Sequence, residues 1–503
     1  MSNPLYDRLL APLLGSARPF LILDDGTSLS HQAFLALAAR QANALTGIGL
    51  VPGDRLAVQV PKSPEALALY AACVMSGIVL LPLNTGYTAA ELAYFLEDSG
   101  AAAVVCDPAD AAAIGEIARR IGAKLLTLNA SGRGSMSDAA EDQPSDFAPT
   151  PRGEDDLAAL LYTSGTTGRS KGAMLSQKNL LSNALTLVDL WKFGPSDVLL
   201  HALPIFHTHG LFVATNVMLA AGGTMIFLPK FDLDAALRLM PMATSMMGVP
   251  TFYTRLLDSP AFTHDLAAHM RLFISGSAPL LAETHTAFEA RTGHRILERY
   301  GMTETNMSVS NPYDGERRAG TVGFPLPDVE LKITDPETGA TLPQGETGMI
   351  EVRGPNVFQG YWKMPEKTKA ELREDGFFIT GDIGRVDADG YVSIVGRAKD
   401  LIISGGLNVY PKEVELFLDE QPGVLESAVI GVPHADFGEA VVAVLVPTGA
   451  GPDLAEIRAN AAAALAKFKQ PKELIVLPEL PRNTMGKVQK AALRETYKAL
   501  FQA

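Results

Sequence analysis

The sequence predicts an α/β protein with a large N-terminal body built on parallel sheets, followed by a small α+β C-terminal lid domain. Two observations lead to this architecture. Apolar, strand-like runs alternate with helix signals through the first third of the chain, which is typical of parallel sheets. After residue 396 the pattern becomes a compact mixture of strands and helices about 100 residues long, a common size for a small domain.

The first elements carry clear boundary signals. A strand is expected at Leu56–Val60. Ser63 and Pro64 then begin a helix, because Ser is a good N-cap and Pro is favoured at the first helical position. An apolar strand returns at Gly77–Leu83. We therefore expect a strand–helix–strand unit here.

The next unit has the same form. Thr88 and Glu91 have the spacing of a capping box, and Gly100 ends the helix that they begin. A strand is expected at Ala102–Cys106. Residues 129–153 are polar and rich in Ser, Asp, Gly and Pro. A domain linker is the alternative, but we interpret them as a surface loop within one large domain because the loop at 163–172 follows at once.

The lid is expected to begin near residues 396–400, which divides the chain into domains of residues 1–396 and 397–503. Just before this boundary, Asp389-Gly390 is a good hairpin turn. The expected elements of the lid are helices from Pro411 and over about 454–466, and strands at Leu425–Val432, Ala440–Val446 and Leu474–Leu477.

Bulk composition disfavours several classes of function. Hydrophobic residues make up 47% and charged residues 19% of the 503 residues, ordinary values for a globular protein. The net charge of −14 disfavours a general affinity for nucleic acid or an anionic membrane. Cys73 and Cys106 lie in apolar surroundings, and neither a signal peptide nor a membrane span is evident. We therefore expect a cytoplasmic protein with buried thiols.

Residues 163–172 are the most informative segment of the chain. They read Thr-Ser-Gly-Thr-Thr-Gly-Arg-Ser-Lys-Gly, after an apolar run and before a helix expected near Ser176. Glycines let backbone N–H groups approach an anion, while Arg169 and Lys171 supply positive charge. A Walker A loop would end in Gly-Lys-Ser/Thr, whereas Lys171 stands between a serine and a glycine. The segment predicts a phosphate-binding loop of another kind.

With four further motifs, the chain resembles the adenylate-forming superfamily of acyl-CoA synthetases, peptide-synthetase adenylation domains and luciferases. The resemblance spans essentially the whole chain, and ordered motifs are more specific than any single one. It implies a mobile lid, the use of ATP, Mg²⁺ and CoA, and an acyl-AMP intermediate. The motifs that follow the loop are Tyr300–Glu304, Thr380–Asp382, Gly396–Asp400 and Pro481–Lys487.

The resemblance implies that these motifs and Gly276–Ala278 bind ATP and AMP. Tyr300 offers a flat face to adenine, and Thr303 can donate to the α-phosphate. Glu304 is a hard oxygen ligand suited to Mg²⁺, although alone it could be a solvated turn residue. The full implied set is Thr163, Ser164, Gly165, Thr166, Thr167, Gly168, Lys171, Gly276, Ser277, Ala278, Tyr300, Gly301, Met302, Thr303, Asp382, Arg397 and Lys487.

Asp382 and Arg397 form a second part of the implied nucleotide site. The resemblance places the Asp382 carboxylate on the ribose hydroxyls, where its hydrogen bonds would be charge-assisted. Arg397 is implied to be its companion at the domain junction. The alternative for Asp382 is a turn residue that follows a glycine.

Lys487 is implied to be the central catalytic residue. Joining a carboxylate to ATP brings two anions together, and an ammonium group between them lowers the barrier. The alternative is a solvated lysine in a lysine-rich tail, but Lys487 alone has the family's Pro-x-x-x-x-Gly-Lys context. Acylation of Lys487, as in relatives, would remove its charge. A regulatory lysine acetyltransferase and deacetylase are therefore candidate partners.

Lys399 resembles the family's hinge, about which the lid moves between two poses. In one pose Lys487 supports adenylation. In the other, Ser404, Gly405 and Gly406 face the CoA thiol, and the paired glycines suit a close backbone approach. A surface lysine and a glycine turn are the alternatives.

Two histidines and one arginine are the candidate residues for the acyl pocket. His207 and His209 invite a metal interpretation, but catalytic zinc usually takes three protein ligands and no further Cys or His is close in sequence. The resemblance instead implies that His207 and Ser277 lie near the carboxylate being activated, unless His207 is a packed loop residue. Arg255 could grip a second carboxylate with two parallel hydrogen bonds, which looks like the malonyl-CoA synthetase branch. A solvated helix residue is the alternative for Arg255.

We therefore expect an enzyme that converts malonate, or methylmalonate, and CoA into the acyl-CoA, releasing AMP and pyrophosphate. Its partners would be small molecules rather than nucleic acid or membrane, and the oligomeric state stays open. The alternatives are a short- or medium-chain monocarboxylate ligase, an adenylation enzyme that loads a carrier protein, a nucleotide-binding regulator and a luciferase-like oxygenase. The presence of Lys487 and Glu304 argues against the regulator.

Overall fold

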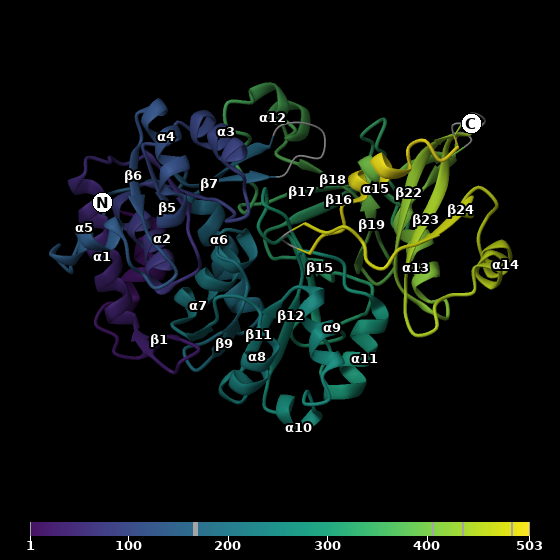
Figure 1. Cartoon of the computed structure of the whole chain (residues 1–503), viewed down its shortest axis with the longest axis horizontal. Helices are drawn as coiled ribbons and strands as arrows, with labels where there is room; N and C mark the ends of the chain where they lie inside the picture. Colours follow the sequence, from purple (N-terminus) through teal and green to yellow (C-terminus); the bar gives the residue numbers. More distant parts are fainter. Residues whose placement is uncertain (1, 164–169, 405–406, 435–436, 484–485, 502–503) are drawn as a thin grey trace. The chain divides into compact units, whose positions relative to one another are not determined.

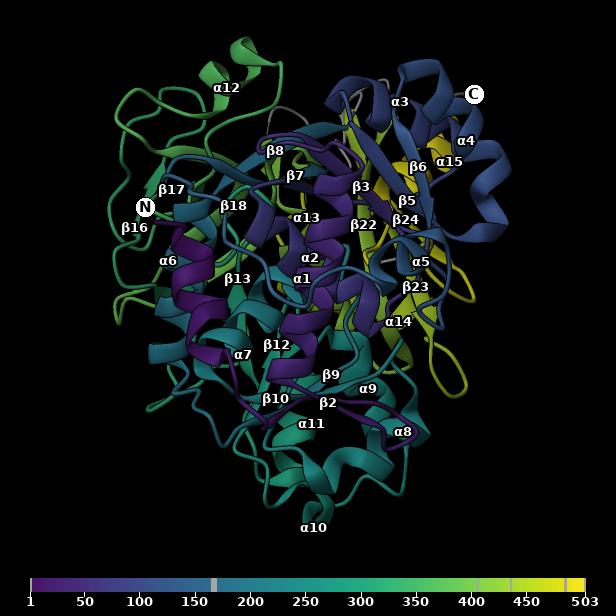
Figure 2. The ribbon, with the colours of Figure 1, turned by 90° about the vertical axis from the view of Figure 1, so that its left-hand side faces the viewer.

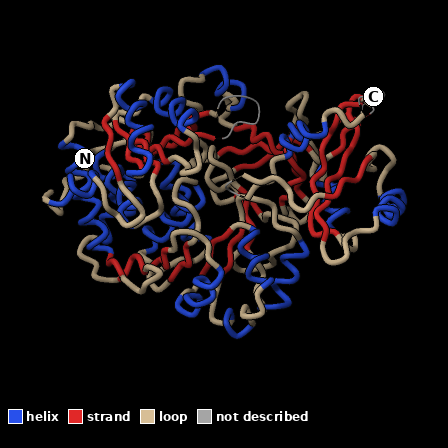
Figure 3. The backbone as a smooth tube through the Cα atoms, in the orientation of Figure 1, coloured by secondary structure: helices blue, strands red, loops and turns tan. Residues whose placement is uncertain are grey.

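The computed structural model describes residues 2–163, 170–404, 407–434, 437–483 and 486–501. The chain divides into two compact units, which we treat separately. Unit 1 comprises Met1–Glu330 and Arg353–Phe378, and unit 2 comprises Leu331–Val352 and Ile379–Ala503. Unit 1 contains largely parallel sheets with many helices (Figure 1), whereas strands dominate unit 2 (Figure 3). Among the helices in these described ranges, none combines the length and apolar character that a membrane crossing requires.

The smaller sheet of unit 1 has the strand order β6-β5-β3-β4-β7-β8. Its strands are parallel except for β8, which returns antiparallel beside β7. The chain passes from β3 to β4 on one side of β3 and then crosses to β5 on the other, so a switch point lies between β3 and β5. The elements are β3 (Arg55–Gln59), β4 (Val79–Pro82), β5 (Ala103–Cys106), β6 (Lys124–Thr127), β7 (Leu157–Thr163), β8 (Lys171–Ser176), α1 (His31–Gly47), α2 (Pro64–Ser76), α3 (Ala89–Ser99), η3 (Pro108–Asp110), α4 (Ala111–Ile121), α5 (Ser135–Glu141) and α6 (Gln177–Leu190).

The helix boundaries predicted in this region are confirmed. The Ser63 side chain accepts a hydrogen bond from the backbone of Ala66 and caps α2. Thr88 and Glu91 form both hydrogen bonds of the capping box of α3, and Gly100 ends α3 in the left-handed conformation. Local capping chemistry therefore sets these helix ends.

Two expectations for unit 1 were wrong in detail. Residues 129–153, expected to be a surface loop, contain α5, and its Met136 and Ala140 are buried because two apolar residues four apart anchor a short helix. The helix predicted near Ser176 is confirmed, with Ser176 as the N-cap of α6, but the loop at 163–172 does not lead directly into it. Lys171–Ser176 forms β8, so this loop joins two antiparallel strands, and the N-terminus of α6 lies at the far end of β8.

The larger sheet of unit 1 has the strand order β15-β14-β13-β12-β11-β9-β10-β1-β2. The run from β13 to β1 is parallel. The chain passes from β9 to β10 and then crosses to β11 on the other side of β9, which gives a switch point between β9 and β11. Its strands are β1 (Pro19–Ile22), β2 (Ser28–Ser30), β9 (Val198–His201), β10 (Thr224–Phe227), β11 (Ser245–Gly248), β12 (Leu272–Ser275), β13 (Leu297–Tyr300), β14 (Val309–Ser310) and β15 (Phe324–Pro325).

Helices gather around β11 and β12 at one end of unit 1, as both views show (Figures 1 and 2). Large buried side chains from α9, α11 and β12, including Tyr253, Phe273 and Phe288, form one core cluster there. The remaining helical elements of unit 1 are η1 (Tyr6–Leu10), η2 (Ala11–Leu13), η4 (His209–Thr215), α7 (Asn216–Ala221), α8 (Leu233–Leu239), η5 (Met240–Met242), α9 (Pro250–Asp258), α10 (His264–Ala267), α11 (Ala282–Thr292) and α12 (Pro365–Glu371).

Unit 2 contains a sheet of order β16-β17-β18-β19 and a sheet of order β21-β20-β23-β22, with β24 beside β23. The predicted hairpin turn at Asp389-Gly390 is confirmed and joins β18 to β19. The predicted lid strands and helices are also confirmed, with ends shifted by a few residues. The elements are β16 (Glu330–Thr334), β17 (Gly348–Arg353), β18 (Phe378–Val386), β19 (Val392–Arg397), η6 (Ala398–Asp400), β20 (Ile402–Ser404), β21 (Leu407–Val409), α13 (Pro411–Asp419), β22 (Val424–His434), β23 (Gly438–Pro447), α14 (Leu454–Ala464), β24 (Glu473–Val476) and α15 (Lys490–Tyr497).

Unit 2 begins earlier in the chain than the predicted lid, because it includes the β16–β19 sheet. The predicted division into residues 1–396 and 397–503 concerns a lid that moves about Lys399. It stays a prediction.

Candidate active site

One group of candidate site residues of unit 1 lies at the carboxyl edge of the larger sheet. β12 and β13 are parallel neighbours, so Gly276–Ala278 and Gly301–Glu304 leave the sheet at the same edge. The loop that carries His207 and His209 follows β9, which borders the switch point. Ligands of open α/β sheets bind at such crevices.

His209 and Ser277 are in direct contact within this edge. The His209 Nδ1 atom lies 3.1 Å from Ser277 Oγ. Ser277 has a φ of 70°, a strained conformation for a residue with a Cβ that is most often found at functional sites. Burial, together with the nearby charge of Arg299, holds the pKa of His209 well below its usual value. The imidazole is therefore neutral at physiological pH.

Arg299 places a buried positive charge beside the Gly276–Ala278 segment. The residue is 3% exposed, and its Nε and Nη2 atoms have no hydrogen-bond partner among the described residues. Burial lowers the pKa of Arg299 to about 9, so the guanidinium keeps its charge at neutral pH. A Cβ added to Gly276 would stand 2.3 Å from Arg299 Cζ. The buried carboxylate of Glu298 offsets part of this charge, but donors without partners are costly to bury, so the two free nitrogen atoms fit an anionic ligand.

Sequence reasoning missed Arg299, although a signal existed. Strands of parallel sheets covered on both faces are usually almost wholly apolar, yet β13 contains Glu298 next to Arg299. Both residues are buried. Arg255, the arginine chosen from the sequence, lies on α9 and is exposed.

A cluster of polar side chains surrounds Glu304, which is 4% exposed. The Tyr361 hydroxyl lies 3.0 Å from Glu304 Oε1 and 2.7 Å from Glu371 Oε2. Lys171 Nζ lies 3.2 Å from Glu371 Oε2 and 4.1 Å from the centre of the Tyr361 ring. Burial and the two carboxylates raise the pKa of Tyr361, so its hydroxyl stays protonated and donates. This cluster joins Lys171 of the phosphate loop to Glu304.

The site chemistry of Glu304 fits Mg²⁺. Magnesium is usually held in proteins by one or two carboxylates together with phosphate oxygens and water. Glu304 supplies a carboxylate oxygen at the edge of the sheet, and Lys171 lies near the hairpin expected to bind phosphate. The donor set therefore suits a metal that arrives with a nucleotide.

The segment from Gly301 to Asn306 forms a tight turn around Thr303. A Cβ at Gly301 would stand 1.8 Å from the carbonyl oxygen of Asn306, so only glycine fits. Thr305 N donates to Met302 O at 3.1 Å. The backbone of this turn therefore fixes where the Thr303 and Glu304 side chains begin.

Part of the predicted nucleotide site lies outside the described residues. Thr163 pairs with Lys171 at the base of the hairpin, which brings the ends of the predicted phosphate loop together. The predicted site residues that lie outside the described ranges are Ser164, Gly165, Thr166, Thr167, Gly168, Gly405 and Gly406.

Unit 2 brings together the predicted ribose-binding pair. Asp382 and Arg397 are opposite each other in the β18–β19 ladder, and Arg397 Nε lies 2.6 Å from Asp382 Oδ1. Asp382 is 3% exposed. Burial lowers the pKa of Lys399, which follows in η6, and Ser404 is buried at the end of β20.

Lys487 stands at the base of a turn in unit 2. Its backbone N–H donates to Asn483 Oδ1 at 3.0 Å, and the backbone N–H of Asn483 donates to Lys487 O at 2.9 Å. The turn is tied to β22 by an ion pair between Arg482 and Glu426. The Lys487 residue itself is exposed.

Comparisons with known proteins identify the family of the chain. A family model described as AMP-binding enzyme matches residues 15–362, and one described as AMP-binding enzyme C-terminal domain matches residues 413–487. A solved structure of ATP-bound MatB from Rhodopseudomonas palustris is 60% identical, with a TM-score of 0.98 and full coverage of both chains. A malonate–CoA ligase from Arabidopsis thaliana is 35% identical over 98% of this chain and 84% of its own. A sulfoacetate–CoA ligase from Cupriavidus necator is 36% identical over 95% of this chain and 94% of its own.

Proposed function

The chain belongs to the AMP-binding enzyme family, and we propose that it is an ATP-dependent ligase that joins malonate to CoA. Methylmalonate is the next preferred acid. The carboxylate first attacks the α-phosphorus of ATP to give acyl-AMP and pyrophosphate, and the CoA thiol then displaces AMP. The observation that carries the choice of acid is the buried guanidinium of Arg299, with two unpartnered nitrogen atoms beside Gly276.

Arg299 favours an acid that has a second anionic group. A guanidinium offers two parallel donors that match a carboxylate, and a hydrocarbon chain in its place would leave a buried charge unpaired. A site of this kind rejects analogues that lack the partner group, by roughly 10⁴-fold in favourable cases. The similarity to ligases named for malonate and sulfoacetate, both acids with two anionic groups, supports the same conclusion.

Arg255 remains a proposed second contact for the distal carboxylate. It lies on α9, the helix that directly follows β11 at the switch point. Its exposure means that the unliganded residue bears little desolvation cost. We propose that Arg299 is the main anchor and that Arg255 adds attraction from the mouth of the site.

We propose that His207, the His209–Ser277 pair and the Glu304 cluster organise the adenylation step. A neutral His209 can share a hydrogen bond without repelling or fixing the carboxylate that must react. Thr303 would donate to the α-phosphate and Tyr300 would face adenine. When bound at Glu304, Mg²⁺ would neutralise phosphate charge as the pyrophosphate leaves.

We propose that Lys487 supplies the positive charge at the bond being formed. Two negatively charged oxygen atoms approach in this step, and a preorganised ammonium group stabilises the charge that builds up there. The second half-reaction would use the lid in its other pose, with Lys399 as hinge and Ser404, Gly405 and Gly406 near the thiol. Asp382 and Arg397 would hold the ribose in both steps.

We extend this proposal to the regulation of the enzyme by acetylation. Lys487 is exposed, and its acetylation by a lysine acetyltransferase would remove the charge that adenylation needs. A deacetylase would restore activity. A cytosolic location is part of the same proposal.

An acid panel tests the proposed function. The purified protein is incubated with ATP, Mg²⁺ and malonate, methylmalonate, acetate or butyrate, with and without CoA, while pyrophosphate and acyl-CoA are measured. We expect pyrophosphate release to be fastest with malonate and malonyl-CoA to form only when CoA is present. Faster turnover of butyrate would favour the monocarboxylate ligase, and no acid-dependent release would contradict the proposal.

A further inference from the structure

Lys62 makes an unusual set of contacts just after β3. Its Nζ lies 2.8 Å from His201 Nδ1, 2.9 Å from the carbonyl oxygen of His201 and 2.9 Å from that of Leu203. It also lies 4.2 Å from the centre of the Phe227 ring, a cation–π distance. Burial of this amine lowers the pKa of Lys62. The amine is surrounded by acceptors that belong to the end of β9 and the segment after it.

These contacts fix the tautomer of His201. The ring is fully buried, and burial together with the charge of Lys62 lowers the pKa of His201 to about 3, so the ring is neutral. Its Nε2 lies 2.8 Å from the carbonyl oxygen of Gly210, which can only accept, so Nε2 carries the proton. Nδ1 must then accept from the Lys62 amine. The result is a directional chain of hydrogen bonds from Lys62 through His201 to Gly210.

The chain of hydrogen bonds ties both ends of the segment 201–210 to one amine. The start is held at the carbonyl oxygens of His201 and Leu203, and the end is held through the His201 ring at Gly210. A Cβ at Gly210 would stand 2.1 Å from the carbonyl oxygen of Pro204, so the segment is folded tightly on itself. It has little freedom to adopt another shape while Lys62 is in place.

The same segment reaches the candidate active site. Thr208 Oγ1 donates to Asn306 Oδ1 at 2.5 Å, in the turn that carries Thr303. His209 contacts Ser277 at 3.1 Å. Lys62 is therefore linked to the site by an unbroken series of contacts, although it touches none of the residues proposed to bind the acid.

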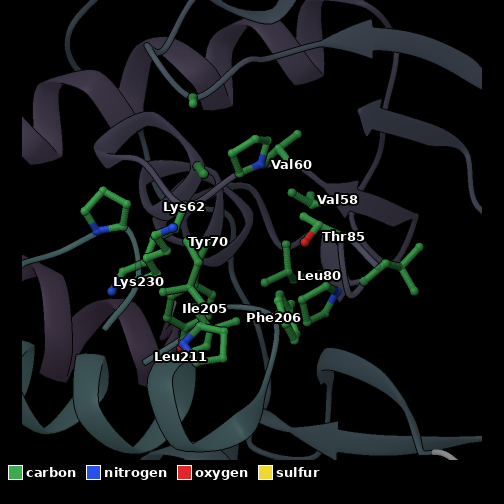
Figure 4. Close-up of a pocket in the computed structure, with 17 residues that line it drawn as sticks. Val58, Val60, Lys62, Tyr70, Leu80, Thr85, Ile205, Phe206, Leu211 and Lys230 are labelled. Carbon is green, nitrogen blue, oxygen red and sulfur yellow. The ribbon is translucent and has the colours of Figure 1, made fainter. Parts of the chain in front are cut away.

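The segment also forms part of the lining of a cavity. Ile205 and Phe206 line a cavity of about 380 Å³ together with Lys62 and Lys230 (Figure 4). The segment thus contacts this cavity through residues 204–206 and the site through residues 208–209. A change in the conformation of residues 201–210 would therefore alter both the cavity and the candidate active site.

We infer that Lys62, acting through the Nε2-protonated tautomer of His201, is a positioning residue that holds His207 and His209 in place for activation of the acid. This inference rests on the proposed function, in which this segment meets the reacting carboxylate. Lys62 does not contact the reacting atoms, so its effect is on geometry.

The first test replaces the amine while keeping an unbranched side chain. Lys62→Met should lower kcat/KM for whichever acid the wild-type protein activates best by roughly 10²-fold, because small misplacements of reacting groups have effects of this size. The KM for ATP should change less than about threefold. Thr244→Val is the matched control, since Thr244 Oγ1 makes its hydrogen bonds at the opposite end of β9, to Val198 and Asp197. Equal kinetic losses in both variants, or wild-type kinetics in Lys62→Met, would overturn the inference.

A second pair of variants does not depend on the folding of Lys62→Met. His201→Gln keeps one donor and one acceptor and should retain activity within a few fold, whereas His201→Leu should lose activity as Lys62→Met does. Equal activity of the two His201 variants would contradict a positioning role.

The third measurement is independent of any substrate. Two-dimensional ¹H–¹⁵N spectra of the histidine side chains should show the Nε2-protonated neutral form of His201, assigned by its loss in His201→Gln. An Nδ1-protonated or charged ring would overturn the inference. This result stands even if the acid panel contradicts malonate as the substrate.

Discussion

Gly276 lies directly against the Arg299 guanidinium: a Cβ at position 276 would stand 2.3 Å from Arg299 Cζ. The glycine is needed here because the guanidinium lies directly against the backbone where β12 ends. The adjoining residue, Ser277, holds a strained φ of 70° and contacts His209. The loop after β12 therefore connects a buried cation to the residues proposed to meet the reacting carboxylate.

A methyl group at position 276 should displace Arg299 without unfolding the protein. The colliding atoms lie at the far end of a flexible side chain, so Gly276→Ala is expected to move the guanidinium rather than the backbone. We expect kcat/KM for malonate to fall roughly 10- to 100-fold, an effect typical of a displaced binding group, while that for butyrate stays within about threefold. Steady-state kinetics with both acids, beside a thermal unfolding curve, check this. Equal losses for the two acids would point to a general disturbance of the site.

Arg255 should contribute less to malonate recognition than Arg299. Because Arg255 is exposed, its pairing with a carboxylate is screened by water, and such contacts are usually worth about 1 kcal/mol or less. We expect Arg255→Ala to raise the KM for malonate by several fold and to leave that for acetate unchanged. Kinetics with the two acids decide the matter. Unchanged malonate kinetics would return Arg255 to the class of solvated helix residues.

Removing the amine of Lys487 should separate the two half-reactions. Lys487→Ala should lower malonate-dependent adenylation by at least about 10²-fold, the size of effect seen when one preorganised electrostatic donor is lost. Capture of supplied malonyl-AMP by CoA should stay close to the wild-type rate. The measurements are ATP–pyrophosphate exchange for the first step and acyl-CoA formation from the adenylate for the second. Lys490→Ala, in α15, provides a neighbouring lysine as control, and equal loss of both half-reactions in Lys487→Ala would refute the assigned role.

Buried histidines should make the protein less stable in mild acid. Burial lowers the pKa of His31 to about 4 and that of His201 to about 3, whereas an unfolded histidine titrates near 6.5. Between these values the unfolded chain binds protons that the folded chain does not, so the free energy of unfolding falls as the pH falls below about 6.5. At pH 5 each such histidine would cost about 2 kcal/mol.

Comparison with His201→Gln isolates one of these contributions. Between pH 7.5 and pH 5 the wild-type protein should lose about 2 kcal/mol more stability than His201→Gln. Urea unfolding at the two pH values gives this difference, because acidic groups common to both proteins cancel. Equal losses would mean that His201 is protonated in the folded protein.

Much of the fold could be predicted because its signals are local. Ser63 and the Thr88–Glu91 pair sit within a few residues of the helix ends that they cap, so the sequence shows them directly. The turn at Asp389-Gly390 is equally local. The strand β8 was missed because it is short, its sequence does not alternate between polar and apolar residues, and it pairs with β7 only after the chain turns back.

The candidate site was predictable only in part, because its motifs are local but many of its contacts are not. The motifs that contain Glu304 and Asp382 could be found as short patterns, but their partners are distant in sequence. Tyr361 meets Glu304 across 57 positions, and Lys62 meets His201 across 139. The spacing of residues in the sequence does not predict such contacts, because they depend on the order of the strands in the sheet. The importance of Arg299 likewise depends on its burial, which only the structure reveals.

The ratio of kcat/KM for malonate to that for butyrate, measured in the wild-type protein and in Arg299→Met, shows whether the buried guanidinium selects the acid. We expect a wild-type ratio above about 10³, since butyrate would leave the guanidinium without a carboxylate partner. We also expect the ratio to fall by at least 10²-fold in the variant, which lacks the guanidinium. A wild-type ratio near one, or a ratio that Arg299→Met leaves unchanged, would contradict the account.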